Sequence, residues 1–439
     1  MRTLRTATLA LIVCAAPLSA QEVPLLAAYD TAWHTIARTF YDTALVNGRW
    51  RSVADSIRGT LGTSPTEAQL RRAIRAMIAV PGQSHFALIT SDAIPRAKGG
   101  TAADGPPGSA GVTVRLAGDT LIVWRVDPAG PAAGTGIRPG DAIERVDDNT
   151  VTMIRERLAT AFPDNPREAN GLLLQVFTAV LDGPAGSTVD VGTRRLDGTA
   201  ANLTITRRAK SGRLQQYGNL PPMVIQATLD TTMVRAGSRD VAVPVIAFSG
   251  WFPVITADLD RFAFGARSAE AVIIDLRGNL GGVVGIIGGF AGHFSDSTWS
   301  LGSMRGRGAT LRLAANPRRA TSTGERVDVI RAPVAILIDP LTASSSEFFA
   351  AGMQALGRAR VFGEASAGQS LPAAMKRLPN GDVLMHAIAD HEDARGRRIE
   401  GIGVQPDTPT PLTRSGLAAG RDVALEAARR WLADTLSRR

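Results

Sequence analysis

Three short apolar runs in the C-terminal half of the chain constrain its fold most strongly. They are rich in β-branched residues and cover residues 243–248, 271–275 and 332–338. Continuous apolar runs of this length are typical of strands buried in a sheet. Stretches with helical patterning alternate with them and follow them, at 283–294, 347–356 and 421–436. This alternation, which begins near Met223, predicts an α/β fold built in layers.

The first part of the chain is predicted to be helical. From about residue 23 to residue 94, apolar residues recur at helical spacing, as in the series Leu70, Ile74 and Ile78. The sequence Ser-Pro-Thr-Glu at 64–67 has the composition of a helix start. Residues 98–108 are rich in glycine and proline and predict a linker. We therefore expect a helical N-terminal domain over residues 21–97.

The next segment, residues 109–208, consists mostly of short alternating runs that predict strands. Within it, residues 130–141 read Gly-Pro-Ala-Ala-Gly-Thr-Gly-Ile-Arg-Pro-Gly-Asp and lead into the apolar run 142–146. This order resembles a PDZ domain, which implies that an extended peptide can add as a strand with its terminal carboxylate on backbone amides. The candidate carboxylate loop, 111–114, departs from the usual Gly-Leu-Gly-Phe form. Another β-rich module with a tight Pro-Gly-Asp turn is the alternative.

Composition excludes several classes of protein. With 439 residues, 44% of them hydrophobic and 20% charged, the chain is globular and long enough for about three domains. The formal charge of +9 is spread along the chain without a long basic run, which argues against nucleic-acid binding. The single cysteine, Cys14, excludes an intramolecular disulfide and a cysteine-built metal site.

The N-terminus has the pattern of a secretory signal. Two arginines precede an apolar run at 7–16, and small residues surround Ala20. We expect cleavage after Ala20, so residues 1–20 form a signal peptide and the mature protein is periplasmic or secreted. A lipoprotein cut before Cys14 is the alternative, which the bulky Val13 disfavours. No later apolar run is long enough to predict an integral membrane span.

A serine-rich segment lies where one predicted strand ends and a helix begins. Residues 342–350 read Thr-Ala-Ser-Ser-Ser-Glu-Phe-Phe-Ala. One interpretation is a capping box made by Ser344 and Glu347. The other places a nucleophilic hydroxyl at a helix N-terminus, where free amides and the helix dipole stabilise negative charge. The two can hold together, because a neighbouring serine can cap the helix.

Two further segments could carry chemistry. The sequence Asp-Leu-Arg-Gly-Asn-Leu-Gly-Gly at 275–282 joins a strand to a helix, and its glycines allow backbone amides to face an anion or an oxyanion. It lacks the Gly-Lys-Ser/Thr of a phosphate loop, so a structural turn is the alternative. Of the five histidines, His85 lies in a loop beside Ser84, which could orient its imidazole.

Taken in order, these motifs resemble the C-terminal-processing (tail-specific) serine peptidases. The order is Ser-His, a PDZ-like segment, Asp-Leu-Arg-Gly-Asn-x-Gly-Gly, Thr-Ala-Ser-x-Ser-Glu, Gly-Glu-x-x-x-Gly and a final Glu-Gly-Ile-Gly-Val-Gln-Pro-Asp at 400–407. Counting the Ser-His pair and the PDZ-like segment that follows it as one, five motifs in a fixed order arise by chance far less readily than a single motif. The resemblance implies a crotonase/ClpP-like α/β peptidase core over residues 209–439, with a helical N-terminal domain and an inserted PDZ-like, β-rich domain. It implies no cofactor and no metal.

One departure from this family concerns the catalytic base. The processing peptidases carry a lysine 25 residues after their serine, and here that position is Gln369, whose amide accepts no proton at neutral pH. Lys376 is too far along the chain for a simple substitute. The tricorn-core branch uses a Ser-His pair before the PDZ domain and a glutamate near the Gly-x-x-Pro-Asp end, and Ser84, His85 and Glu400 match those positions.

The resemblance to that branch assigns a role to each residue. Ser344 is the nucleophile, and His85 takes its proton and returns it to the leaving amine. Ser84 and Glu400 hold and polarise the imidazole. The backbone amides of Ser345 and of a glycine, Gly281 or Gly282, form the oxyanion hole.

The sequence thus predicts a serine endopeptidase that cleaves unfolded or extended polypeptides, with the substrate C-terminus in the PDZ-like groove as one option. A non-catalytic protein that binds peptides or lipophiles on the same fold is one alternative. A Ser-Lys peptidase that uses Lys376 is the other. The sequence does not specify the natural substrate, the oligomeric state, or whether the PDZ-like domain inhibits or delivers substrate.

The signal peptide makes a direct prediction. Intact-mass measurement and N-terminal sequencing of protein secreted by a bacterial host should give a mature chain that starts at Gln21, because small residues precede the cut. Replacement of Ala20 by arginine should block processing there. A mature chain that begins at Cys14 and carries added lipid mass would instead show lipoprotein export.

Overall fold

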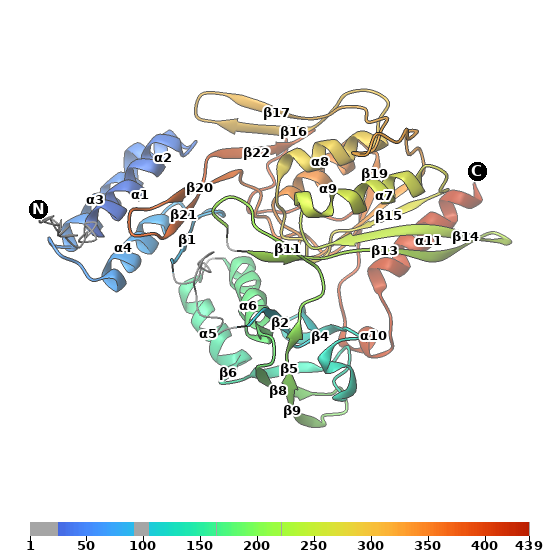
Figure 1. The fold of residues 1–439 in the computed structure, drawn as a ribbon, viewed down its shortest axis with the longest axis horizontal. Coiled ribbons are helices and arrows are strands. Elements are labelled where there is room, and N and C mark those ends of the chain that lie inside the picture. The colour runs from blue at the N-terminus through green and yellow to red at the C-terminus, as the bar shows by residue number, and fades with distance from the viewer. Residues whose placement is uncertain (1–24, 92–104, 164, 221, 439) are drawn as a thin grey trace, which may run out of the picture.

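The structure is a computed structural model, and it describes residues 25–91, 105–163, 165–220 and 222–438. Three parts follow one another along the chain: helices at the N-terminus, a β-rich part, and a large α/β part that contains the C-terminus (Figure 1). The predicted signal peptide and most of the predicted linker lie outside the described residues. No helix in these described ranges is long and apolar enough to cross a membrane.

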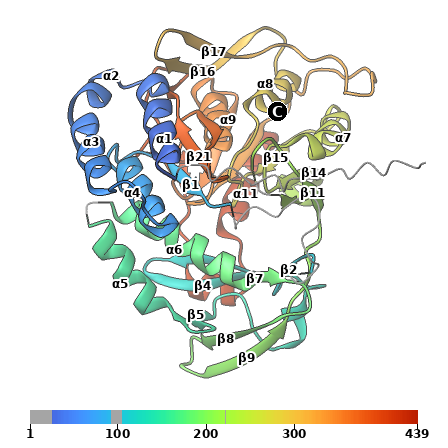
Figure 2. The ribbon, with the colours of Figure 1, turned by 60° about the vertical axis from the view of Figure 1, so that its left-hand side comes forward.

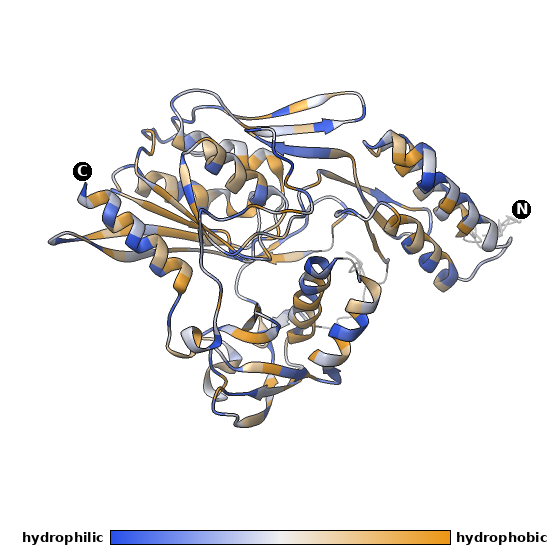
Figure 3. Cartoon of the chain, turned by 180° about the vertical axis from the view of Figure 1, so that it is seen from behind, coloured by the Kyte–Doolittle hydropathy of each residue, from blue (hydrophilic) through white to orange (hydrophobic). Residues whose placement is uncertain are grey.

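A six-stranded sheet forms the centre of the α/β part. Its strands lie in the order β13 (Ala227–Ala236), β14 (Arg239–Phe248), β15 (Val272–Asp275), β18 (Val334–Ile338), β19 (Ala359–Gly363) and β23 (Thr408–Pro409). β13 pairs antiparallel with β14, and the other neighbours are parallel. β14, β15 and β18 correspond to the three apolar runs that the sequence predicted as strands, whereas β13, β19 and β23 were not predicted. The centre of this sheet is mainly hydrophobic in Figure 3.

Helices cover both faces of this sheet. Alternate strand residues point to opposite faces, so Ile274 and Ile336 pack with one set of helices and Ile273 and Leu337 with another. The first set is α7 (Thr256–Ala266), α8 (Val284–Ala291) and α9 (Ser345–Ala355), and the second face is covered by α11 (Val423–Ser437). The predicted α/β layers are therefore confirmed.

The N-terminal helices do not form a separate core. They are α1 (Leu25–Thr39), α2 (Thr43–Leu45), a π-helical turn (Val46–Trp50), α3 (Arg51–Thr60) and α4 (Glu67–Ala79). The expected helix start is present, with Thr66 as the N-cap of α4. Their buried side chains share one hydrophobic cluster with Leu371, Leu378 and Leu384 from the C-terminal half of the chain.

The prediction that the helical pattern continues to about residue 94 is wrong at its end. Residues 87–89 form a strand, β1 (Ala87–Ile89), which pairs with β21 (Val383–Ala387), and β21 pairs with β20 (Ala373–Arg377). Figure 2 shows the helices beside β1 and β21. A second small sheet joins β16 (Trp299–Gly306) to β17 (Thr310–Ala315) and to β22 (Ala389–Asp393).

The β-rich part contains the expected strands and two helices that the sequence analysis missed. Its sheet runs β3 (Val112–Ala117), β4 (Thr120–Val126), β5 (Ala142–Val146), β8 (Thr188–Arg194) and β9 (Ala200–Thr206), with β6 (Asn149–Thr150) beside β5. The missed helices are α5 (Val151–Ala161) and α6 (Pro166–Leu181). Thr150 and Asn165 cap them, so start signals were present where only alternating runs were expected.

The end of the predicted linker is a strand. β2 (Pro107–Ser109) pairs with β7 (Asp182–Pro184) and with β10 (Arg208–Ala209). The two ends of the β-rich part therefore meet in one small sheet. β11 (Arg213–Gln215) and β12 (Met223–Ile225) then lead into β13, and α10 (Arg414–Ala418) precedes α11.

Candidate functional site

Ser344 occupies a sharp turn between β18 and α9. Its backbone has φ 55° and ψ −123°, a conformation that costs a non-glycine residue free energy. Within the described ranges, His85, Asp147 and Ser344 are the non-glycine residues with positive φ. Two of these three are the predicted base and nucleophile, and such strain is concentrated at functional sites.

Glu347 holds the Ser344 turn in place. Its carboxylate is fully buried, and Oε2 accepts hydrogen bonds from the N–H groups of Ser344 and Gln369, both at 3.0 Å. Oε1 accepts from the Gly368 N–H at 2.7 Å and from Ser366 Oγ at 2.6 Å. The sequence analysis saw Glu347 only as a helix cap, and it missed this link to residues 366–369.

The charge state of Glu347 reflects two opposing effects. Burial raises the pKa of its carboxyl to about 7. The four hydrogen-bond donors act in the opposite direction, because they favour the ionised form. An ionised carboxylate is acceptor-only, and four donors match that capacity. Removal of the carboxylate would leave buried donors unpaired.

The glycine turn at 275–282 packs directly against Ser344. Gly281 has φ 100°, and a Cβ there would lie 2.6 Å from the Ser344 Cβ and 3.0 Å from the Ser345 nitrogen. Ser345 Oγ donates to the Gly282 carbonyl at 2.8 Å, which fixes the turn to the start of α9. The Gly281 N–H donates to Asn279 Oδ1 at 3.0 Å. Among the described residues, the Gly282 and Ser345 N–H groups have no hydrogen-bond acceptor.

Ser84, His85 and Glu400 form one hydrogen-bonded network. The Ser84 N–H donates to Glu400 Oε1 at 2.8 Å, and Ser84 Oγ donates to Oε2 at 3.0 Å. Ser84 Oγ also lies 2.8 Å from Nδ1 of His85. Glu400 is only 5% exposed, and 316 residues of chain separate it from Ser84. The fold therefore brings these three residues together, as the sequence predicted.

The donor count fixes the tautomer of His85. The hydroxyl of Ser84 has one hydrogen, which goes to Glu400, so Nδ1 of His85 must donate to Ser84 Oγ. This leaves Nε2 with the free lone pair. Burial lowers the pKa of His85 to about 4, so the imidazole is neutral at physiological pH. Burial also raises the pKa of Glu400 above its usual range, against hydrogen bonds from Ser84 and the Ser370 N–H.

One short loop connects this network to Ser344. The Gln369 carbonyl accepts from the Ser344 N–H at 2.9 Å, and the next residue, Ser370, donates its N–H to Glu400 Oε2 at 2.8 Å. In the parts of the chain that the structure describes, no direct hydrogen bond joins His85 to Ser344. Gln369, which stands where the processing peptidases carry a lysine, thus contributes two backbone hydrogen bonds to the site.

The β-rich part also touches this region. Arg115 on β3 forms a buried ion pair with Asp339, with Nε 2.6 Å from Oδ2. The other oxygen of Asp339 accepts from the Gly278 N–H at 2.9 Å. Burial tends to raise the pKa of Asp339, but Arg115 and this N–H hold it below its usual range. A side chain of the β-rich part is therefore fixed between the glycine turn and the loop before Ser344.

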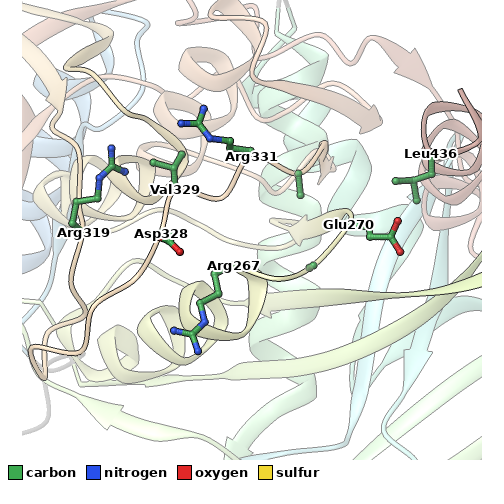
Figure 4. A pocket seen from close by; sticks show the side chains of 9 residues that line it. Arg267, Glu270, Arg319, Asp328, Val329, Arg331 and Leu436 are labelled. Atoms are coloured by element: carbon green, nitrogen blue, oxygen red, sulfur yellow. The ribbon is translucent and has the colours of Figure 1, made fainter. Parts of the chain in front are cut away.

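Other candidate groups lie elsewhere. Lys376 is exposed on β20. No cluster of three metal-ligating side chains occurs within the described ranges. A surface hollow of about 630 Å³ is lined by Arg267, Arg319, Arg331, Glu270 and Asp328, among others, and by none of the predicted site residues. Its arginine side chains point in different directions (Figure 4).

Comparison with known sequences identifies relatives. The model of peptidase family S41 matches residues 249–410. Carboxyl-terminal-processing peptidase 2 of Arabidopsis thaliana chloroplasts is 24% identical over 405 residues, 87% of this chain and 68% of that protein. A tricorn protease homolog of Streptomyces coelicolor is 24% identical over 430 residues, which are 93% of this chain but only 32% of the relative.

Solved structures share the fold. The photosystem II D1 C-terminal processing protease superposes with a TM-score of 0.60 at 20% identity, over 94% of this chain and 99% of that one. Mature CPAF superposes with a TM-score of 0.65 at 14% identity, over 94% and 98% of the two chains. The whole described architecture, and not only residues 249–410, therefore recurs in these proteins.

The carboxylate of Glu347 makes a testable contribution to stability. We expect Glu347→Gln to lower the free energy of unfolding by about 1–3 kcal/mol, because an amide turns its NH₂ toward donors that need an acceptor. Urea unfolding followed by circular dichroism measures the change. Glu426→Gln on α11, where the carboxylate makes long ion pairs of 3.5–4.0 Å, is the control and should cost less than about 0.5 kcal/mol. Equal losses in both variants would contradict the role given to Glu347.

Proposed function

Since the chain carries a peptidase family S41 domain and is a serine-type hydrolase, we propose that it cleaves unfolded or extended polypeptides as an endopeptidase. The observation that carries the proposal is the network of Ser84, His85 and Glu400, tied through residues 369 and 370 to Ser344. A buried carboxylate, an oriented neutral imidazole and a strained serine at a helix start are the parts that acyl transfer needs.

The mechanism begins with attack by Ser344. Its Oγ bonds to the scissile carbonyl carbon, while Nε2 of His85 takes the hydroxyl proton. The tetrahedral intermediate collapses when His85 gives that proton to the amide nitrogen, and the amine leaves with its C–N bond broken. Water then attacks the acyl-enzyme, with His85 again as base, and releases Ser344 and the carboxylic acid product. Ser84 and Glu400 hold the ring and stabilise the imidazolium that forms in each half.

The oxyanion would bind to the Ser345 and Gly282 N–H groups. Both lie beside the Ser344 turn and have no acceptor among the described residues, whereas the Gly281 N–H is already bonded to Asn279. This favours Gly282 over Gly281 as the second donor. Each such donor is worth about 10²–10³-fold in rate. The role of Gly281 is then to leave room, because any side chain there would collide with Ser344.

The β-rich part would act as a PDZ-like module on a crotonase/ClpP-like core. Strand β3, which contains residues 112–114 of the candidate carboxylate loop, is where an extended substrate segment, its C-terminus included, would add. The ion pair between Arg115 and Asp339 gives this module a direct contact with the catalytic loops. We place the mature enzyme in the periplasm or outside the cell, on the signal peptide pattern of residues 1–20.

Labelling with a fluorophosphonate tests the catalytic serine. The wild-type protein should form one covalent adduct at Ser344, and Ser344→Ala should form none, as shown by peptide mass spectrometry. His85→Ala should label about 10²–10⁴-fold more slowly, because general-base catalysis is lost. His34→Ala, a change at an exposed histidine on α1, and Lys376→Ala should label at the wild-type rate.

Two other outcomes would change the proposal. A folded wild-type protein that forms no adduct, and cleaves nothing in a peptide library analysed by mass spectrometry, would indicate a binding protein on this fold. Loss of labelling in Lys376→Ala, with full labelling in His85→Ala, would indicate a Ser-Lys peptidase.

The buried imidazole predicts an unusual pH dependence. The lowered pKa keeps His85 unprotonated, and therefore able to act as a base, down to about pH 4. Protonation of His85 should consequently not reduce the labelling rate between pH 8 and pH 5, and it should halve the rate near pH 4. A change in the labelling rate near pH 7 that disappears in Glu347→Gln would report the titration of the Glu347 carboxyl. A midpoint near 6.5 in a folded protein would contradict a buried base.

A further inference from the structure

The loop that carries His85 needs support from outside itself. Gly82 and His85 have φ 60° and 62°, so two of four consecutive residues are in the left-handed region. Glu400, the other end of the network, lies in a segment that follows a tight turn at 394–397. The distance between Nε2 of His85 and the nucleophile therefore depends on what holds these two segments relative to each other.

Tyr41 joins the two segments directly. Its hydroxyl donates to Gln83 Oε1 at 2.7 Å, and Gln83 precedes Ser84. The same oxygen accepts from an NH₂ group of Arg398 at 3.2 Å, and Arg398 lies two residues before Glu400. Arg398 is itself fixed, because its Nε lies 3.0 Å from both oxygens of Asp390 on β22.

The aromatic neighbours of Tyr41 hold the other side of the loop. Its ring contacts Phe40 with centroids 4.8 Å apart, and Phe40 contacts Phe86 at 5.3 Å. Phe86 follows His85, so the two residues after α1, Phe40 and Tyr41, contact the loop on both sides of the imidazole. Phe40 is fully buried, which anchors this contact in the core that the helices share with the C-terminal half of the chain.

We propose that Tyr41 is a positioning residue for catalysis. It fixes the position of the segment that carries His85 relative to the segment that carries Glu400. The proposal rests on the proposed function, because it concerns the same base. Tyr41 acts through Gln83 and Arg398, and its hydroxyl makes no hydrogen bond to Ser84, His85 or Glu400, all of which the structure describes. The charged groups in this network are Glu400, Arg398, Asp390 and Arg305, whose guanidinium lies 3.6 Å from Asp390.

Tyr41→Phe tests the hydroxyl alone. Both hydrogen bonds of the hydroxyl are lost, and we expect kcat for a cleaved peptide, or the labelling rate at Ser344, to fall about fivefold to tenfold, which corresponds to about 1–1.4 kcal/mol. KM should stay within twofold. The acid midpoint of the rate should also rise by one pH unit or more, because a loosened loop exposes the imidazole to water. A purely structural hydroxyl would not move that midpoint.

Tyr29→Phe is the matched control. The Tyr29 hydroxyl donates to the Ala54 carbonyl at 2.7 Å in the same helical segment, away from the network, and is buried. This variant should lose similar stability and keep the wild-type kcat and pH midpoint. Gln83→Leu removes the acceptor of the Tyr41 hydroxyl and should reproduce Tyr41→Phe, and the double variant should be no slower than Gln83→Leu. If Tyr41→Phe does not fold, Gln83→Leu carries the test.

The outcomes separate the two proposals. If the wild-type protein is active and Tyr41→Phe or a folded Gln83→Leu shows the wild-type kcat and midpoint, Tyr41 has no positioning role. The same conclusion follows if kcat falls as much in Tyr29→Phe as it does in Tyr41→Phe. If the wild-type protein neither cleaves nor labels at Ser344, the proposed function itself is wrong.

Discussion

A single buried carboxylate organises the region around Ser344. Glu347 accepts hydrogen bonds from the Ser344 turn and from the loop at 366–369, and without it the N–H groups of Gly368 and Gln369 would lose their acceptor. The next residue of that loop, Ser370, then reaches Glu400. The position of the His85 imidazole relative to Ser344 thus depends on a series of hydrogen bonds that starts at the Glu347 carboxylate. Glu347 itself makes no hydrogen bond to His85.

The same loop shows what position 369, where the processing peptidases carry a lysine, contributes to this structure. At position 369 it is the backbone that makes hydrogen bonds to the site. The N–H donates to Glu347 and the carbonyl accepts from the Ser344 N–H. A glutamine satisfies both bonds as well as a lysine would. Under the proposed mechanism, the proton acceptor is instead the imidazole of His85, whose other nitrogen, Nδ1, lies 2.8 Å from Ser84 Oγ.

The fold could be predicted where local pattern decides it. Buried parallel strands are continuous apolar runs, and the helix start at Thr66 has a capping signature, so both were visible in the sequence. β1 was not, because three residues carry no periodicity and the strand exists only through its pairing with β21. α5 and α6 were missed although Thr150 and Asn165 mark their starts. Ser84, His85, Ser344 and Glu400 were predicted from motif order. Tyr41 and the wider role of Glu347 depend on contacts that no local pattern encodes.

The core shared by the N-terminal helices and residues 371–387 has a consequence for biosynthesis. A ribosome makes the chain from its N-terminus, so about 300 residues separate the emergence of α4 from that of β21, and until then the helices lack the strands that cover their apolar face. Throughout that interval no assembled proton relay exists, since Glu400 is made later still. Under the proposed mechanism, a nascent chain therefore cannot cleave a polypeptide until Glu400 has been made and residues 371–387 have packed on the helices.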